Sequence, residues 1–304
     1  MDTVVRGIRI SNPGRVVYPD LGLTKLDLVR YYDRVAEWML PHVQNRPLTL
    51  VHCPAGLQAP CNYMRHRRVW GPNVLKRVTI KEKTKVGEYL AVVNLEGVIA
   101  LAQMGIIEVH TWNSTIDDVE RPNRIVWDLD PGPEVKLRDV IAAAIAVRDL
   151  LETLGLQSWV KTTGGHGIHV VAPLTPQRQW DECLAFAKAV AEALTRTDAS
   201  RYTTAFAKAG REKKILIDYL RNNRTNTSVA AFSARARPAA TVSMPRSWKQ
   251  LTAQLKPEAF TVTTVPKTLR TDQWRDYWSC EQKISASAFK AITRLRLPSV
   301  ARVG

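Results

Sequence analysis

Several kinds of segment are missing from this 304-residue chain. It has no apolar run approaching the roughly 18 residues that a membrane-spanning helix needs. Its first residues, MDTVVRGIRI, lack the charged-then-apolar pattern of a secretory signal peptide. Neither an internal repeat nor a low-complexity segment is present. These absences argue against a membrane protein. A chain of 304 residues is long enough for one large domain or two modest ones, and its 45% hydrophobic residues are ordinary for a globular protein.

Cysteine is scarce, with four residues at positions 53, 61, 183 and 280. The nearest two, Cys53 and Cys61, are eight positions apart, which is not the spacing of a zinc ribbon. Reduced cytosolic thiols are therefore the expectation. Because His52 and His66 lie near this pair, a metal site there stays open as an alternative.

Acidic residues are also few. The chain has 28 Asp and Glu against 44 Lys and Arg, which leaves a net charge of +16. Such an excess favours a polyanionic partner, nucleic acid first and an anionic membrane surface second. Residues 65–85 hold eight basic residues against the single acid Glu82, so we expect a phosphate-facing segment, with a solvated loop as the alternative. The eight are Arg65, Arg67, Arg68, Lys76, Arg77, Lys81, Lys83 and Lys85.

Helices and strands alternate without a strict repeat. Thr24 and Asp27 predict a capping box for a helix over about 24–40, with Pro41 after its end, and Asn94 and Gly105 bracket a second helix. Further helices are expected at 137–154, 180–195 and about 285–295. Strands are expected at 46–53, 88–94, 106–112, 124–130, 158–163, 168–174, 213–220 and 228–237. Short loops between neighbouring strands favour antiparallel pairing and an α+β or mixed α/β class; the last residues, PSVARVG, are expected to fray.

Two aspartates interrupt the apolar strand in RIVWDLDPGP, residues 124–133. Side chains alternate along a strand, so Asp128 and Asp130 share one face, about 6–7 Å apart. Asp218 occupies a second apolar strand, in KKILIDYLRN. Three such carboxylates can hold two hard divalent cations, the arrangement used for in-line nucleotidyl displacement. A lone Asp-x-Asp could equally be a turn cap, a single-metal glycosyltransferase site or a partner for lysines.

The segment KTTGGHGIH, residues 161–169, is read as strand, glycine turn and strand. It is neither a P-loop nor a dinucleotide fingerprint, because both of those open a helix. Its glycines would let backbone N–H groups approach an anion, while a tight hairpin is the plainer explanation. SARAR is expected to place Arg235 and Arg237 on one strand face, suited to phosphate oxygens.

In their order, VHTWNS, ERPNRIVWDLDP, KTTGGHGIHVVAPL, IDYLRNNR and AAFSARAR closely resemble the polymerase domain of bacterial ligase D, the primase-polymerase module of non-homologous end joining. The resemblance covers residues 6–295. It implies an α+β, mixed α/β primase-polymerase fold with a central, largely antiparallel sheet that carries the acidic triad and is flanked by helices. It also implies one domain over 1–300, with a DNA-facing subregion at 1–95, a catalytic core at 96–240 and a C-terminal wrap and tail at 241–304.

The resemblance assigns roles residue by residue. Asp128, Asp130 and Asp218 would bind two Mn²⁺ or Mg²⁺ ions, with His110 as a further catalytic residue beside the incoming nucleotide. The residues that would grip an NTP or dNTP are Thr163, Gly164, Gly165, His166, His169, Lys214, Arg235 and Arg237. Those that would contact DNA, including its 5′-phosphate and template break, are Arg15, Lys25, His52, Tyr63 and Arg65.

Some positions depart from the family pattern. Thr163 and His166 stand where the glycine turn usually has Ser and Lys, so nucleotide affinity is expected to be weaker or pH-dependent. His52 replaces a common Arg, and Met64, Arg65 and His66 replace a Gln-Lys-His triplet, which changes the expected 5′-phosphate contacts. A Lys-x-Asp-Gly adenylation motif is missing, so this chain is not expected to seal nicks.

We therefore expect a template-dependent nucleotidyltransferase that extends primers and fills short gaps at DNA break ends, with a preference for ribonucleotides. Its partners would be DNA with gaps, overhangs or 5′-phosphorylated ends, together with Ku and a DNA ligase, in the bacterial cytoplasm at the nucleoid. Two alternatives remain at this stage. One is a non-catalytic module that binds and aligns DNA ends; the other is a primase that starts chains without a primer.

Overall fold

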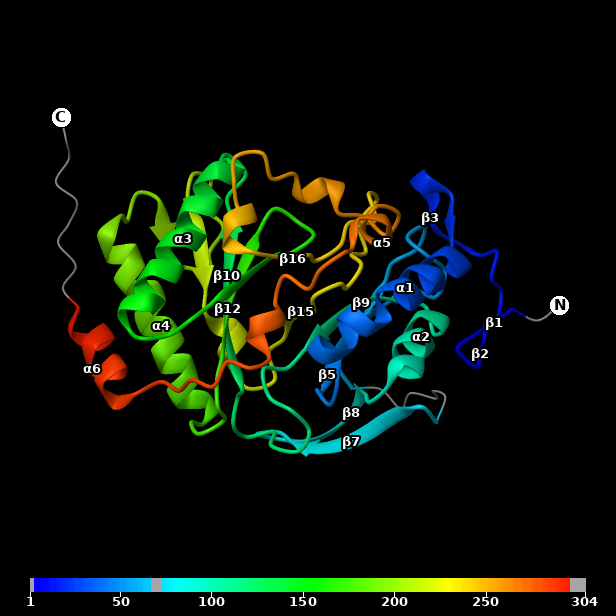
Figure 1. Ribbon diagram of the computed structural model, residues 1–304, viewed down its shortest axis with the longest axis horizontal. Helices are drawn as coiled ribbons and strands as arrows, with labels where there is room; N and C mark the ends of the chain where they lie inside the picture. The colour runs from blue at the N-terminus through cyan, green and yellow to red at the C-terminus, as the bar shows by residue number, and fades with distance from the viewer. Residues whose placement is uncertain (1–2, 67–72, 296–304) are drawn as a thin grey trace. The chain divides into compact units, whose positions relative to one another are not determined.

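The computed structural model describes residues 3–66 and 73–295 (Figure 1). The expectations for Arg67, Arg68 and the fraying tail lie outside these residues. The chain divides into two compact units. Unit 1 comprises 1–117, 227–244 and 256–272, and unit 2 comprises 118–226, 245–255 and 273–304. Among the described residues, none of the helices is both long enough and apolar enough to cross a membrane.

Unit 1 is built on a four-stranded antiparallel sheet in the order β15-β9-β5-β6. Its strands are β15 (Ser228–Val229), β9 (Ile106–Thr111), β5 (Leu48–His52) and β6 (Asn62–Met64). Two helices, α1 (Lys25–Val43) and α2 (Leu95–Gln103), pack with this sheet into one apolar core. Small hairpins complete the unit: β1 (Val4–Val5) with β2 (Ile8–Arg9), β3 (Val16–Tyr18) with β4 (Leu23–Thr24), and β7 (Leu75–Lys81) with β8 (Val86–Val92), beside the short helix α5 (Val265–Thr268).

The expected start of α1 is confirmed, but its expected end is wrong. The Thr24 hydroxyl accepts from the Asp27 N–H at 3.2 Å, and the Asp27 carboxylate accepts from the Thr24 N–H at 2.9 Å. The helix then continues through Pro41 to Val43. Proline costs a helix one backbone hydrogen bond. Here that cost is offset because His42 and Val43 are buried and the Gln44 N–H still reaches the Leu40 carbonyl.

Unit 2 contains a six-stranded sheet in the order β13-β14-β10-β12-β11-β16. Its strands are β13 (Tyr202–Thr203), β14 (Ile215–Asp218), β10 (Arg124–Pro131), β12 (Ile168–Pro173), β11 (Trp159–Thr162) and β16 (Pro245–Arg246). Only the edge pair of β13 and β14 is parallel; every other pairing is antiparallel. The helices of this unit are α3 (Leu137–Thr153), α4 (Trp180–Thr197) and α6 (Ala286–Arg294). The largely antiparallel α+β architecture is therefore confirmed.

The two faces of strand β10 have different surroundings. Trp127 is fully buried on one face, where its indole N–H donates to the Ala187 carbonyl of α4. On the opposite face, Val126 packs with Val171 under the aromatic rings of Trp274 and Tyr277. Asp128 and Asp130 follow Val126 at alternate positions, so they share this second face. The alternation along the strand thus places Asp128 and Asp130 on the face that carries Trp274 and Tyr277, opposite the face that packs on α4.

The segment 228–237 differs from its expected strand. The paired strand is Ser228–Val229, and the Ala230 N–H still donates to the Val109 carbonyl of β9 at 2.8 Å. Phe232 then adopts a left-handed backbone with φ +62° and turns the chain. An isolated bridge between Ala234 and Val242 follows, and Arg235 and Arg237 lie outside any strand. The expectation that these two arginines share a strand face is wrong, since a run of small residues allows a turn as readily as a strand.

Candidate active site

The three aspartates lie together on adjacent strands of unit 2. Asp128 and Asp130 belong to β10, and Asp218 ends β14. Asp128 is directly opposite Asp218 in the antiparallel register, and Asp130 is opposite Leu216. The alternation along two strands and their register therefore cluster three carboxylates that are up to 90 positions apart in the sequence.

Asp128 is also opposite His169 of β12, which in turn is opposite Lys161 of β11. A row of charged or ionisable residues thus crosses four strands: Asp218, Asp128, His169 and Lys161. Lys161 is 4% exposed and His169 is 2% exposed, so both lie inside the protein. The His169 Nε2 atom lies 3.3 Å from Asp128 Oδ1. Lys161 is a part of this site that the sequence reasoning missed.

Two arginines that the sequence reasoning also missed pair with the triad. Arg221 Nε donates to Asp128 Oδ2 at 3.1 Å, and its terminal nitrogen lies 3.0 Å from Asp218 Oδ2. Arg211 donates to Asp130 Oδ2 at 2.7 Å. Arg221 follows Asp218 by three residues in the motif IDYLRN, so its closeness to the triad could have been predicted from the sequence. Arg211 lies in a loop, where no sequence pattern indicates its pairing with Asp130.

These cations control the ionisation of the buried acids. Burial acts to raise the pKa of Asp128, but His169, Arg221 and Lys161 together hold it well below its usual range. Burial prevails at Asp218 and raises its pKa despite Arg221. Burial and Lys161 lower the pKa of His169 to about 4. At neutral pH the Asp128 carboxylate is therefore charged, and His169 lies beside it at 3.3 Å.

Carboxylate oxygens are the donors that hard divalent cations prefer, so the chemistry of the triad suits Mg²⁺ or Mn²⁺. In the described arrangement their oxygens are engaged by Arg211 and Arg221. Within residues 3–66 and 73–295, no group of three His, Cys, Asp or Glu side chains is arranged to hold an ion as it stands. A bound cation would consequently compete with these two arginines for the carboxylates.

The glycine turn joins β11 to β12 beside the triad, as expected from its sequence. The Thr163 N–H donates to the Gly167 carbonyl at 3.1 Å, and the Gly165 N–H donates to the Thr163 hydroxyl at 3.2 Å. Gly164 has φ +70°, a conformation that favours glycine. A Cβ on Gly167 would lie 2.8 Å from the Leu129 carbonyl oxygen and 3.5 Å from Asp128 Oδ1, so glycine permits the close approach to β10.

Two further predicted nucleotide contacts lie near these strands in unit 2. His166 is exposed at the tip of the glycine turn. Lys214 precedes β14, and its carbonyl accepts from the Gly132 N–H at 2.9 Å, just after β10. Unit 2 thus brings together the triad, the glycine turn, His169 and Lys214.

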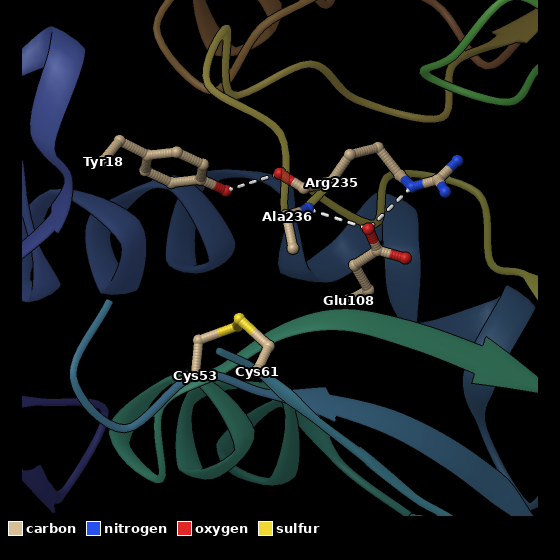
Figure 2. The surroundings of a disulfide bond; sticks show 6 residues. All are labelled: Tyr18, Cys53, Cys61, Glu108, Arg235 and Ala236. Atoms are coloured by element: carbon tan, nitrogen blue, oxygen red, sulfur yellow. Dashed lines mark hydrogen bonds and ion pairs between the residues drawn. A yellow bond between two sulfur atoms is a disulfide. The ribbon is translucent and has the colours of Figure 1, made fainter. Parts of the chain in front are cut away.

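The other predicted nucleotide contacts belong to unit 1, where a buried acid connects two of them. His110 Nε2 lies 2.8 Å from Glu108 Oε2 on strand β9. Arg235 Nε lies 3.0 Å from the other carboxylate oxygen of Glu108, Oε1 (Figure 2). Burial opposes the ionisation of Glu108, but His110 and Arg235 lower its pKa to about 2. Arg237 lies two residues beyond Arg235 and is exposed.

The residues expected to contact DNA ends lie in unit 1 as well. Arg15 and Lys25 line a small cavity of about 10 Å³ together with Cys53 and Pro54. The Arg15 guanidinium donates to the Pro54 carbonyl, and the Lys25 ammonium donates to the Ser11 carbonyl at 2.8 Å. Tyr63 on β6 is 59% exposed, and its ring centroid lies 5.9 Å from that of His110. His52 ends the neighbouring strand β5, opposite Asn62, and Arg65 directly follows β6.

The expectation of reduced thiols is wrong for one pair, because Cys53 and Cys61 form a disulfide (Figure 2). Strands β5 and β6 pair up to His52 and Asn62, which brings the next residues of both strands, the two cysteines, to a Cα separation of 4.5 Å. The alternative of a metal site is excluded for these two sulfurs. His66 instead pairs with Glu82 and lies 2.9 Å from the Tyr89 hydroxyl.

The basic segment is a hairpin where a loop was the alternative. Strands β7 and β8 pair from Leu75 to Val92, with a turn at residues 82–85. The basic residues of the hairpin are exposed; they are Lys76, Arg77, Lys81, Lys83 and Lys85. The side chains point to solvent from the hairpin, so their charges are not desolvated.

Comparison with known proteins identifies the family. The curated relatives include LigD proteins of non-homologous end joining from Pseudomonas aeruginosa, 34% identical over 95% of this chain and 35% of that protein, and from Mycolicibacterium smegmatis, 31% identical over 80% and 32%. This chain therefore spans about a third of the length of these relatives. Among solved structures, the polymerase domain of Mycobacterium tuberculosis ligase D in complex with DNA matches with a TM-score of 0.83 and 28% identity, over 89% of this chain and 97% of that one.

A sequence model of the LigD primase-polymerase domain matches residues 24–278, which include every member of the acidic triad. The match spans well over half of the chain, and the solved structure agrees with the fold of both units. The resemblance seen in the motifs is thereby confirmed, and the chain belongs to the LigD primase-polymerase domain family of nucleotidyltransferases.

Proposed function

We propose that this chain extends primers and fills short gaps at the ends of DNA double-strand breaks, copying a template and preferring ribonucleotides. The observation that carries the proposal is the register that opposes Asp128 to Asp218, with Asp130 on the same strand. A module that only binds DNA gains nothing from three clustered carboxylates, because each must be kept charged near the others. Their donor chemistry suits the cations that nucleotidyl transfer uses.

In this reaction the 3′-hydroxyl of a primer attacks the α-phosphate of a nucleotide, a new phosphodiester forms, and pyrophosphate leaves with the electron pair of the broken bond. Asp128, Asp130 and Asp218 would hold two Mn²⁺ or Mg²⁺ ions, which when bound acidify the attacking hydroxyl and stabilise the leaving group. His169 orients the Asp128 carboxylate from the neighbouring strand. The backbone of the glycine turn, held close to β10 by Gly167, supports binding of the triphosphate.

DNA with gaps, overhangs or 5′-phosphorylated ends is the proposed substrate. The two neighbouring cations Arg15 and Lys25 support recognition of a 5′-phosphate. Exposed Tyr63 can stack on a base at the template break, a contact worth about 1–3 kcal/mol per base. The names of the relatives support action in non-homologous end joining. Ku and a DNA ligase are the proposed partners, in the bacterial cytoplasm at the nucleoid.

The test is extension of a gapped, 5′-phosphorylated duplex with Mn²⁺ and either rNTPs or dNTPs. Asp128→Asn keeps the shape of the side chain but removes its charge, so we expect extension to fall by at least about 10²-fold while DNA binding stays within about twofold. Asp149→Asn is the matched control, because Asp149 is an exposed residue of α3 that pairs with its neighbour Arg148. It should extend like the wild type.

Each alternative has its own outcome in this assay. Tight binding of gapped DNA without any extension by the wild type would support a module that aligns ends and would reject the proposal. Products made without a primer would indicate a primase. Equal rates with rNTPs and dNTPs would remove the ribonucleotide preference while leaving the polymerase intact.

A further inference from the structure

Glu108 is a buried acid that has no role of its own in the proposed reaction. Its side chain is 8% exposed and it lies on strand β9 of the unit 1 sheet. An ionised carboxylate at such a site costs several kcal/mol unless it is paired and hydrogen-bonded. The partners of Glu108 show what offsets this cost.

Two hydrogen bonds and one ion pair converge on the two carboxylate oxygens. Oε2 accepts from His110 Nε2 at 2.8 Å. Oε1 lies 3.0 Å from Arg235 Nε and accepts from the Ala236 N–H at 2.8 Å (Figure 2). Two of these three partners, His110 and Arg235, are residues proposed to contact the nucleotide. One carboxylate therefore holds both side chains, although 125 positions separate them in the sequence.

The contact also determines which nitrogen of the His110 ring carries a hydrogen toward Glu108. Glu108 is ionised at neutral pH, so its oxygens can only accept hydrogen bonds. Nε2 must consequently carry the hydrogen in the contact with Glu108. Since His110 and Glu108 alternate on the same face of β9, the strand itself sets their separation.

The backbone that carries Arg235 is held by side chains from α1 and β3. Tyr18 donates its hydroxyl hydrogen to the Arg235 carbonyl at 3.0 Å (Figure 2), and Tyr31 donates to the Phe232 carbonyl at 2.7 Å. The Tyr32 hydroxyl accepts from the Ala234 N–H at 3.1 Å. With the backbone held in this way, the remaining freedom of Arg235 is in its side chain. Glu108 restricts that freedom by engaging Nε.

We infer that Glu108 is the positioning residue of the nucleotide-binding side chains in unit 1: it orients His110 and Arg235 and does not itself contact the substrate. The inference rests on the proposed function, which supplies the nucleotide. Arg235 presents a planar fork of donors whose geometry matches phosphate oxygens. Holding that fork before the nucleotide arrives reduces the entropy lost on binding.

The test measures equilibrium binding of ATP with Mn²⁺ by calorimetry, beside kcat and KM for extension. Glu108→Gln keeps the size of the side chain but removes the charge that pairs with Arg235. We expect the Kd and the KM for ATP to rise at least about tenfold, with Kd for gapped DNA within about twofold. Glu37→Gln on the exposed face of α1 is the matched control and should leave both constants unchanged.

A double-mutant cycle separates positioning from general stability. If Glu108 acts partly through Arg235, Glu108→Gln should weaken ATP binding less in an Arg235→Ala background than in the wild type, by about threefold or more. Glu108→Asp serves if Glu108→Gln does not fold. It keeps the charge but is one methylene shorter, so it cannot reach all three partners, and ATP affinity should fall with little change in Tm.

Each result has a distinct meaning. Wild-type ATP affinity in Glu108→Asp would overturn the positioning role. So would a cycle in which Glu108→Gln weakens ATP binding by the same factor with and without Arg235→Ala. A wild type that binds ATP but does not extend DNA would reject the proposed polymerase activity, and the affinity ratios would still decide the role of Glu108. A wild type that binds no nucleotide would overturn both.

Discussion

Lys25 combines features that suit an anion-binding cation. It is the first residue of α1, where the partial positive charge of a helix N-terminus disfavours a cation and favours an anion. Its side chain is buried, and Arg15 lies nearby in the same cavity. Burial and Arg15 together lower the pKa of Lys25 to about 8. An anion such as a DNA 5′-phosphate would relieve this accumulation of positive charge.

The depressed pKa predicts a pH-dependent preference for phosphorylated ends. Lys25 is charged below its pKa and loses its proton as pH rises through about 8. Preference for a 5′-phosphate over a 5′-hydroxyl should therefore decline several-fold between about pH 7 and about pH 9. Fluorescence anisotropy with the two oligonucleotides measures it.

Lys25→Arg provides the comparison for that experiment, because an arginine stays protonated over this range. Its phosphate preference should be flat with pH. A wild-type preference that is equally flat would show that Lys25 does not contact the phosphate.

The loop between β5 and β6 is the element on which sequence and structure differ most. The disulfide Cys53–Cys61 closes this loop. Cys53 and Pro54 line the cavity of Arg15 and Lys25, and Tyr63 lies two residues after Cys61. The Leu57 N–H also donates to the Val17 carbonyl at 2.9 Å. The disulfide loop thus connects the predicted 5′-phosphate contacts, Arg15 and Lys25, with the predicted stacking residue Tyr63.

Opening this disulfide should destabilise unit 1. Closing a loop of about nine residues removes conformational entropy from the unfolded chain worth about 2–3 kcal/mol. Cys61→Ser should lower the free energy of unfolding in urea by about that amount, and adding a reductant to the wild type should have the same effect. Cys280→Ser, at a residue with a free thiol, is the control and should match the wild type. Unchanged stability in Cys61→Ser would show that the bridge contributes nothing to the fold.

Over the whole chain, the charge of +16 predicts binding to DNA that depends strongly on salt. With about six phosphate contacts, the slope of log K against log salt should be near −5. Replacing Lys81, Lys83 and Lys85 of the β7–β8 hairpin by alanine should reduce the magnitude of the slope by up to about 3, if all three contact phosphates. Lys290→Ala on α6 is a control on another exposed basic residue. Binding that ignores salt would contradict an electrostatic interface.

The local chemistry of the sequence was sufficient for much of the fold and part of the site. Capping by Thr24 and Asn94 depends on residues three positions away, and the common face of Asp128 and Asp130 follows from strand alternation. Such signals lie within a few residues of one another, so they can be read without knowing the fold. The order of the motifs along the chain was also sufficient to predict the family.

The partners of the charged groups were decided only by tertiary structure. Arg211, Arg221 and Lys161 reach the triad across neighbouring strands and loops, and Glu108 joins His110 to Arg235. The Cys53–Cys61 bridge likewise depends on the pairing of β5 with β6. Ion pairs and disulfides require atoms to lie within a few ångströms of each other, and a linear sequence carries no measure of that distance. The residue types that can do the chemistry are therefore visible in the sequence, whereas the packing decides which of them are held together.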